Sequence, residues 1–590
     1  MSLLVVIGAV LLFYVEGIGL ALCILKKYSV NSKNIEISLS VALGLALNTF
    51  LFSNIYYLLP FFSIYELTFT LNSVLVLISL GLLFAIRKGP CWPSRVELST
   101  LLLSLFATML ILRPLLEIKG LGFYFSNNGE FQYYAALADA LKFHPSNFEV
   151  GGPFGLHSRE SYTALFIAQF SSITGTPTLW LTQPIAGSYV LIFFITLTAL
   201  VNILVPLVSD TIKKTFIYLL LASYMLNAST QLFFSLSFVS QYLAMALFVG
   251  VLLMLSVGIP IHSRESIFAL SIVGFFCGNL LLVYPEMYPI NLFLILCYVL
   301  FTQINRKSLS AQNLAVSCLI IILAGFATSI EGTRSFFSRS IPSSGGWNIF
   351  GSLREFKTFS GNLFGLSNPF FGPPKPNNLL LICLLIIGIA ALNNQVKKGN
   401  TWGSVQIWRW MLLVATTLAI AIYSYIYVSK LGTNYILLKY ILGYVWVGYL
   451  MLIIGFVNRK KVGISLCAVF FLLLVGQAQV AVAFSNRFSE DSASAIFKLK
   501  DAVTFQESYQ KPNLIYFPNI SPYVIPARFV VFKENLFKGE GTWAGDGVQY
   551  AEANVVLLLG KRLKLTDDPS LIYKYQISMT NDSFSVFQRE

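Results

Sequence analysis

Charged residues are scarce in this chain of 590 residues: Asp, Glu, Lys and Arg together make up only 11% of it. A soluble globular protein carries roughly a quarter. Hydrophobic residues make up 56%, and the mean hydropathy is +0.73. This composition excludes a disordered chain, a nucleic-acid-binding scaffold and an ordinary cytosolic enzyme. It is typical of a protein that crosses a membrane several times.

Metal-binding and nucleotide-binding motifs are also missing from the sequence. Its three histidines, His144, His157 and His262, share no ligand spacing, and its seven cysteines form no Cys-x-x-Cys pair. Six of the cysteines lie in apolar runs, so we interpret them as small core residues and not as disulfides or metal ligands. There is no P-loop, Gly-x-Ser-x-Gly, His-Glu-x-x-His or Rossmann motif, which leaves no visible machinery for nucleotide-driven work.

Long apolar runs are what the sequence has in abundance. Fourteen runs of about 16 to 25 residues can each cross a bilayer as a helix. They are 3–25, 36–59, 64–86, 98–115, 183–208, 215–231, 237–258, 266–284, 288–305, 313–329, 379–394, 410–428, 433–456 and 463–485. We therefore predict an α-helical polytopic membrane protein with about fourteen transmembrane helices. The first run has its basic residues after it and no cleavage site, which indicates a retained span and not a signal peptide.

The basic residues fall mainly on one side of this predicted topology. One set of short loops and span ends holds most of them: Lys26, Lys27, Lys33, Arg87, Lys88, Arg95, Lys213, Lys214, Arg264, Arg306, Lys307, Lys397, Lys398, Arg409, Arg459, Lys460 and Lys461. The short loops opposite hold only Lys430. The positive-inside rule puts the basic set in the cytoplasm and both termini outside a plasma or inner membrane. This asymmetry accounts for most of the net charge of +14, so no nucleic-acid partner is needed.

The large polar segments all fall on the predicted non-cytoplasmic side. They are loops at about 116–182 and 330–378 and a tail from about 486 to 590. The chain then divides into a transmembrane domain, 1–485, and a soluble domain, 486–590. In the tail, short strand patterns follow a helical stretch near 493–510, which predicts a small α/β domain. The strand patterns cover 513–517, 527–532, 554–560 and 571–577.

The first large loop contains a candidate catalytic carboxylate, Glu130. It follows the turn signal Asn127-Asn-Gly and precedes apolar residues at helical spacing, namely Phe131, Tyr134, Leu137, Ala138 and Leu141. We expect an amphipathic helix along the membrane surface, with Glu130 in its first turn. A carboxylate there can accept a proton or hold a divalent cation, although capping the helix is a sufficient structural role.

Two further charged residues lie near the same predicted face. Glu286, in Tyr284-Pro-Glu-Met-Tyr-Pro, ends the eighth span, where a carboxylate is costly unless it is hydrated or paired. Lys439, in Tyr435-Ile-Leu-Leu-Lys-Tyr, lies about two turns inside the thirteenth span. A lysine in that position is expected to face the bundle interior and an anionic group such as a phosphate, with snorkelling as the simpler alternative.

Other polar residues could hold a substrate at this face. Arg334, in the second large loop beside aromatic residues, could clamp a phosphate. His157 and Arg159 in the first loop are candidates for acceptor binding. Gln241, near the outer end of the seventh span, could hydrogen-bond a ligand or another helix.

These segments resemble motifs of the glycosyltransferase C superfamily. Asn128-Gly-Glu130-Phe-Gln-Tyr-Tyr resembles the acidic loop segment of that superfamily, Tyr284-Pro-Glu286 its acidic turn, and Tyr435 to Lys439 its tyrosine-rich span. In the superfamily that loop usually follows the first span, whereas here it follows the fourth. The resemblance implies a membrane glycosyltransferase that takes a sugar from a polyprenyl-phosphate-linked donor on the outer face, in cell-envelope polysaccharide biosynthesis.

The resemblance also implies roles for the candidate residues. Glu130 would deprotonate the acceptor hydroxyl, and Lys439, with Arg334 or Arg113, would stabilise the leaving phosphate. Glu286 and Tyr284 would position the acceptor or a metal; the sequence requires no metal. The partners would be the lipid-linked sugar, a glycan, lipid or protein acceptor, and membrane lipid.

A second class of function stays open from the sequence. Fourteen spans with a buried lysine also suit a transporter or flippase component for lipid-linked glycans, although such proteins need access from both sides and the large segments here are all outside. A glycan polymerase or ligase shares the transferase chemistry and differs only in its acceptor.

Overall fold

The computed structural model describes about two fifths of the chain, mainly in its N-terminal part. The described residues are 2–27, 35–86, 93–117, 134–135, 137–138, 141–142, 161–176, 178–204, 239–256, 266–284, 288–305, 310–329, 515–516, 555–559, 575–580 and 584–589. Within them are ten long helices: α1 (Ser2–Lys27), α2 (Glu36–Leu58), α3 (Ile64–Ile86), α4 (Arg95–Glu117), α6 (Ser161–Thr174), α7 (Thr178–Leu204), α10 (Val239–Ser256), α11 (Ser266–Val283), α12 (Tyr288–Asn305) and α13 (Ala311–Thr328).

Nine of these helices coincide with predicted spans, which confirms a helical membrane protein. Five are long and apolar enough to cross a bilayer by themselves: Leu3–Lys27, Glu36–Leu58, Ile64–Ile86, Leu181–Val201 and Ala311–Thr328. The predicted sixth span and the last four, 379–394, 410–428, 433–456 and 463–485, lie outside the described residues. The count of fourteen therefore stays a prediction.

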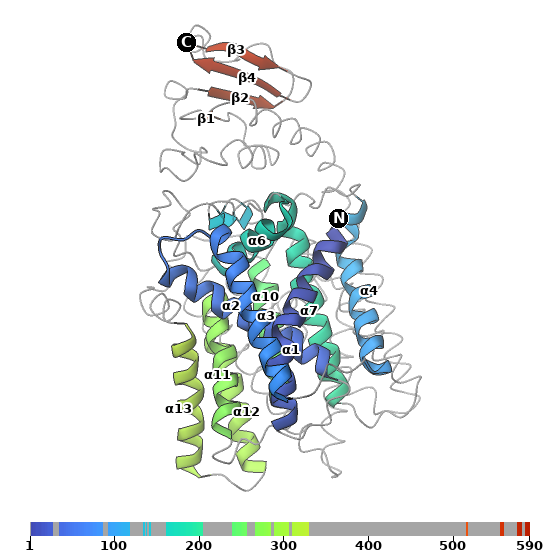
Figure 1. Cartoon of the computed structure of the whole chain (residues 1–590), viewed down its shortest axis with the longest axis vertical. Helices are drawn as coiled ribbons and strands as arrows, with labels where there is room; N and C mark the ends of the chain where they lie inside the picture. Colours follow the sequence, from blue (N-terminus) through green and yellow to red (C-terminus); the bar gives the residue numbers. More distant parts are fainter. Residues whose placement is uncertain are drawn as a thin grey trace, which may run out of the picture.

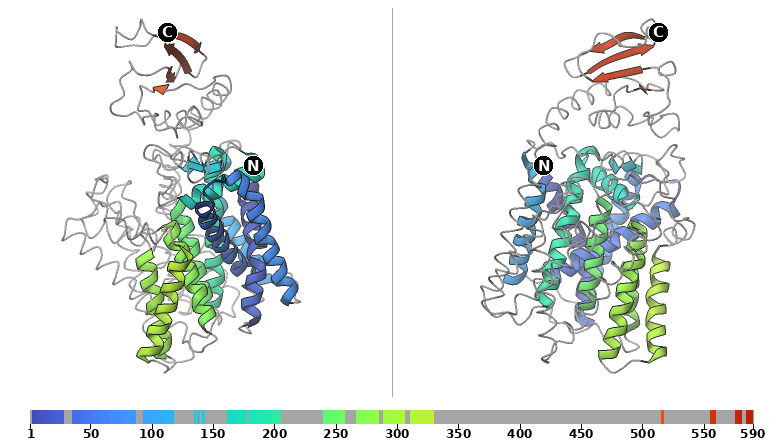
Figure 2. Two further views of the ribbon diagram at one scale, coloured as in Figure 1. Left: turned by 60° about the vertical axis from the view of Figure 1, so that its left-hand side comes forward. Right: turned by 180° about the vertical axis from the view of Figure 1, so that it is seen from behind.

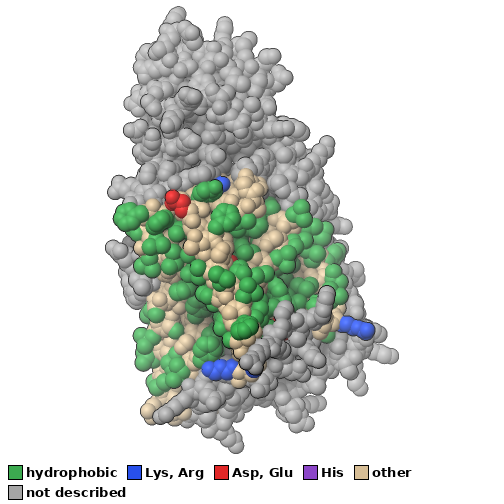
Figure 3. Space-filling model, viewed as in Figure 1, with side chains coloured by type: hydrophobic (Ala, Val, Ile, Leu, Met, Phe, Trp, Pro, Cys, Tyr) green, Lys and Arg blue, Asp and Glu red, His purple; other side chains and the backbone are tan. Residues whose placement is uncertain are grey.

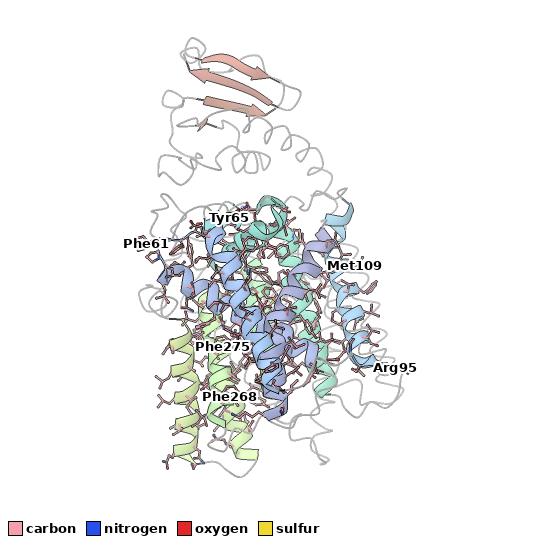
Figure 4. The ribbon with its side chains drawn as sticks, viewed as in Figure 1. Phe61, Tyr65, Arg95, Met109, Phe268 and Phe275 are labelled. Atoms are coloured by element: carbon pink, nitrogen blue, oxygen red, sulfur yellow. The ribbon has the colours of Figure 1, made fainter. Side chains whose placement is uncertain are left out.

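The helices form an upright bundle in which α1 to α4 alternate in direction, as do α10 to α13 (Figure 1). We call the end where α1 begins the upper end. At the lower end, the Lys26 ammonium donates to the carbonyl of Ile86 at 3.2 Å, and Lys27 lies over the Phe268 ring at 4.4 Å from its centroid. Figure 4 shows Phe61 near the upper end and Phe268 near the lower end. Lys26 and Lys27 belong to the set predicted to face the cytoplasm; which side either end faces stays a prediction.

Burial separates a central helix from peripheral ones. The apolar part of α7 is buried throughout, whereas α3 and α13 expose most of their side chains. The exposed side chains of α3 include Phe69, Leu77 and Phe84, and hydrophobic groups cover much of the described face (Figure 3). An apolar surface of this size fits contact with lipid and not with water.

Glycines bring the helices of the bundle into close contact. A Cβ added at Gly44 of α2 would overlap the Phe13 carbonyl oxygen of α1, and one at Gly17 would overlap the Ser40 carbonyl oxygen. The α1 and α2 backbones therefore touch because neither glycine has a side chain. Small residues at such positions are how membrane helices approach closely.

Helix ends are fixed by side-chain caps. Ser63 and Glu66 form a capping box at α3, with the Glu66 carboxylate accepting the Ser63 N–H at 2.7 Å. Ser94 and Glu97 form a second one at α4, and the Glu97 carboxylate also accepts the N–H of Ile37 at 3.1 Å. Glu97 thus holds the start of α2 beside the start of α4.

Helix α6 corrects the prediction for the first large loop. The sequence predicted a polar loop over 116–182, but residues 161–174 form a helix whose side chains are buried from 162 to 172, and α7 begins at Thr178 instead of 183. Gly175, at φ +68°, follows the last turn and accommodates the sharp change of direction. The hydropathy pattern missed α6 because this helix is too short to resemble a span.

The predicted surface helix after Glu130 is helical where it is described. Residues 134–135, 137–138 and 141–142 have helical backbone. Tyr134, Leu137, Ala138 and Leu141 are all at most 1% exposed. The predicted apolar face is therefore confirmed, and it packs in the protein interior.

The described tail residues form a four-stranded sheet in the order β1-β2-β4-β3. Its strands are β1 (Ile515–Tyr516), β2 (Val555–Leu559), β3 (Tyr575–Thr580) and β4 (Phe584–Arg589). β1 pairs in parallel with β2, and the other two pairings are antiparallel. Figure 1 and Figure 2 place this sheet beyond the upper end of the bundle. The predicted strand at 527–532 and helix at 493–510 lie outside the described residues, so the α/β domain stays a prediction.

The cysteines match their interpretation where they are described. Cys23, Cys277, Cys297 and Cys318 are free thiols in buried or half-buried positions of the helices.

Candidate functional site

Three hydroxyl groups from distant parts of the chain meet inside the bundle. The Tyr134 hydroxyl lies 2.8 Å from the Ser240 oxygen, and the Thr163 hydroxyl lies 2.9 Å from the same atom. All three residues are at most 1% exposed. We call Tyr134, Thr163 and Ser240 the hydroxyl triad. It joins the first loop to α6 and to the start of α10.

A second contact ties the helical residues after Glu130 to α6. The Lys142 ammonium donates to the Ser171 hydroxyl at 3.0 Å. The Ser171 hydroxyl in turn donates to the carbonyl of Thr176 at 2.6 Å, just after the end of α6. The segment that carries Tyr134 and Lys142 is thus held at two points about two turns apart, to Ser240 of α10 and to Ser171 of α6.

Helix α6 runs inside the bundle and antiparallel to α1. Gly8 of α1 lies against the Phe170 ring, and one and a half turns further along α1 the Phe13 ring stacks on Phe166 at 4.8 Å. Residue numbers rise along α1 as they fall along α6. The first turn of α6, which contains Tyr162, is therefore the part of α6 farthest from the upper end. With 14 residues, α6 is about 21 Å long and spans only part of a hydrocarbon core of about 30 Å.

A carboxyl group that the sequence analysis overlooked lies at this depth. Glu16 of α1 is 1% exposed, and the Asn48 amide of α2 donates to its two oxygens at 3.1 and 3.0 Å. The Tyr162 hydroxyl donates to the Asn48 carbonyl oxygen at 2.9 Å. Tyr189 of α7 is fully buried beside Tyr162. We call Glu16, Asn48, Tyr162 and Tyr189 the Glu16 cluster.

The two polar groups share the first turn of α6. Tyr162 belongs to the Glu16 cluster and the adjacent Thr163 to the hydroxyl triad. The first turn of α6 therefore contributes to both groups. A single acidic residue inside a 25-residue apolar run was the signal in the sequence that could have found Glu16.

Several predicted site residues are chain neighbours of the hydroxyl triad. Gln241 is described, is 2% exposed and directly follows Ser240. Glu130 precedes Tyr134 by four residues, and Arg159 precedes Thr163 by four. Glu130, Arg159 and the nearby His157 lie outside the described residues, but four residues reach at most about 14 Å. The chain thus limits how far the first two can lie from the triad.

The remaining predicted residues are less constrained. Tyr284 follows α11 at the upper end and is 4% exposed. Arg113 lies in the last turns of α4, which also ends there, but its side chain is outside the described part, as are Glu286, Arg334 and Lys439. The convergence of Glu130, Glu286 and Lys439 stays a prediction.

The described residues offer hydroxyls, amides and one buried carboxyl as site chemistry. No group of three His, Cys, Asp or Glu residues that could hold a metal occurs among them. Neutral hydroxyls can bind sugar or phosphate oxygens, but they do not transfer protons efficiently at neutral pH.

Comparison with known proteins assigns no family. No protein-family model matches the chain, and no curated protein matches it.

Proposed function

We propose that the protein is a membrane glycosyltransferase that moves a sugar from a polyprenyl-phosphate donor to an acceptor at the upper end of the bundle. The observation that carries this proposal is the hydroxyl triad. Its Ser240 hydroxyl is hydrogen-bonded to Tyr134, four residues after Glu130, and to Thr163, four residues after Arg159. Ser240 also directly precedes Gln241. That three residues chosen from the sequence are chain neighbours of one buried group supports the proposal.

Helical spacing supports a catalytic position for Glu130. Residues four apart lie one above the other on the same face of a helix. If the helix at Tyr134 extends back by one turn, Glu130 shares the face that carries the Tyr134 hydroxyl toward Ser240. The carboxylate would then lie next to buried hydroxyls that can hold an acceptor sugar.

The proposed chemistry assigns one role to each residue. Glu130 takes the proton of the acceptor hydroxyl, the acceptor oxygen bonds to the anomeric carbon, and the bond from that carbon to the phosphate oxygen breaks. Arg113, Arg334 and Lys439 are the candidates to neutralise the departing lipid phosphate. The candidates to orient the acceptor are Gln241, His157, Arg159, Tyr284 and Glu286.

The test is sugar transfer by purified protein in liposomes. The donors are polyprenyl phosphates that carry a radiolabelled hexose or pentose, and the acceptors are extracted envelope glycans. Glu130→Gln removes the charge and keeps the size, so transfer should fall by about a hundredfold or more. Glu66→Gln, at a capping carboxylate where Gln also serves, is the matched control and should keep full transfer. Equal activity of wild type and Glu130→Gln would exclude the proposed base.

A second function is favoured by α6. A partial helix inside the bundle, with its first turn beside a buried carboxyl, is also a feature of transporters. A carrier of lipid-linked glycans would move the labelled donor between leaflets without breaking the sugar–phosphate bond. The same liposomes distinguish the two functions, because only a transferase releases free polyprenyl phosphate.

A further inference from the structure

The Glu16 carboxyl lies inside the bundle, near the middle of α1. It is 1% exposed, and along the axis of α1 it lies within about 2 Å of the midpoint of the 26-residue helix. Such a residue is costly in a membrane and normally has a partner or a function.

The hydrogen bonds at Glu16 leave it incompletely satisfied. Both of its bonds come from the single amide of Asn48, and that amide is held by Tyr162. A carboxylate can accept about four hydrogen bonds. Within the described part of the chain, no Lys, Arg or His pairs with Glu16. An ionised Glu16 would therefore be a buried charge without a counter-charge, which is strongly unfavourable.

A second polar group in the same cluster lacks a partner. The Tyr189 hydroxyl is fully buried and has no hydrogen-bond partner among the described residues. Tyr189 interacts electrostatically with Tyr162, and Tyr162 does so with Glu16. Buried hydroxyls are nearly always bonded, so an unpartnered Tyr189 hydroxyl in the same group as an under-satisfied carboxyl points to a small missing guest.

The elements around Glu16 leave few other groups to balance its charge. Helix α1 packs against α2, α3 and α7. The polar groups of this cluster from α2, α6 and α7 are the neutral side chains of Asn48, Tyr162 and Tyr189. The Glu66 carboxylate of α3 does not face Glu16, because it is exposed at the upper end. A guest with one positive charge would balance the carboxylate, and oxygen atoms suit it as ligands.

We propose that the Glu16 cluster binds one small monovalent cation, either a proton or a sodium ion, at the centre of the bundle. Its proposed role differs from sugar transfer, although it shares the first turn of α6 with the hydroxyl triad. It links α1, α2 and α6, and through Thr163 it connects with the hydroxyl triad. Occupancy by the cation thus holds the first turn of α6 in place.

The test is thermal unfolding of the full-length protein in detergent, in two series of buffers. In the first, sodium chloride replaces choline chloride at constant ionic strength. In the second, choline buffers run from about pH 5 to about pH 8. A bound sodium ion raises the melting temperature of wild type by several degrees as sodium increases, while Glu16→Gln does not respond. A bound proton instead makes wild type lose stability relative to Glu16→Gln as the pH rises, because unfolding releases that proton.

Either response supports a cation site and identifies its ion. If wild type and Glu16→Gln change in parallel in both series, the proposal is wrong. Glu66→Gln, which alters an exposed carboxylate, is the control and should behave like wild type in both series.

A milder variant keeps the test decisive if Glu16→Gln does not fold. Tyr189→Phe removes only the orphan hydroxyl. If the cluster binds a cation, the melting temperature of Tyr189→Phe changes less than that of wild type, in the sodium or the pH series. If the cluster is empty, losing an unpaired buried hydroxyl leaves the stability unchanged or raises it. The melting temperature then depends on sodium and pH as it does in wild type. The second outcome would overturn the proposal.

Discussion

Replacing Gly44 by alanine tests the close packing that brings Glu16 next to Asn48. A Cβ at Gly44 would overlap the backbone carbonyl of Phe13, so α1 and α2 must move apart. Forced overpacking of this kind costs about 1–3 kcal/mol, and more where backbone is the obstacle. Alanine regains only about 0.5–1 kcal/mol of helix propensity. We expect the free energy of unfolding to fall by about 1–2 kcal/mol and the Asn48–Glu16 contact to weaken.

Gly81 of α3 is the matched control, because nothing lies within 4 Å of a Cβ added there. Gly81→Ala should leave stability unchanged or raise it slightly, since alanine favours the helix. The assay is reversible unfolding in mixed micelles, followed by circular dichroism, for both variants and wild type. If Gly44→Ala is as stable as Gly81→Ala, the close approach of α1 and α2 is wrong.

Two further predictions concern the triad and the topology. Ser240→Ala removes the hydroxyl to which Tyr134 and Thr163 are both bonded, and it should lower the free energy of unfolding by about 1–3 kcal/mol in the same assay. Ser99→Ala is the control and should have no effect, because the Ser99 hydroxyl is exposed and bonded within its own helical turn. In a cysteine-free background, Phe61→Cys at the upper end should react with a membrane-impermeant maleimide in intact cells, and Ser310→Cys at the lower end only after permeabilisation. The reverse pattern of labelling would invert the predicted orientation.

The spans were predictable because lipid contact demands long apolar runs. The predicted run 64–86 has the same bounds as α3, and 288–305 has those of α12. Capping boxes fix such ends locally; Ser63 and Glu66, for example, lie within one turn of each other. Apolar length and local caps are both properties of contiguous sequence.

Helix α6 and Glu16 were not predictable by the same reasoning. α6 is buried because α2, α3 and α7 pack around it, which no local pattern encodes. Glu16 is one residue in an apolar run, and averaging over the run hides it. The triad depends on three hydroxyls separated by up to 106 residues, among many others of the same kind. The sequence could suggest Gln241 and the segment after Glu130, but only the fold joins them.

The central claim is that the first loop, α6 and α10 meet at one site. Disulfide cross-linking tests it most directly, in membranes of a cysteine-free background that carries Thr163→Cys and Ser240→Cys. These side-chain oxygens lie 2.9 Å apart, which brings the Cβ atoms within reach of a disulfide. We predict rapid cross-linking by a mild oxidant, detected as a linked peptide pair by mass spectrometry, and none for Ser99→Cys with Ser240→Cys. No link between positions 163 and 240, or an equal yield from the control pair, would contradict the account.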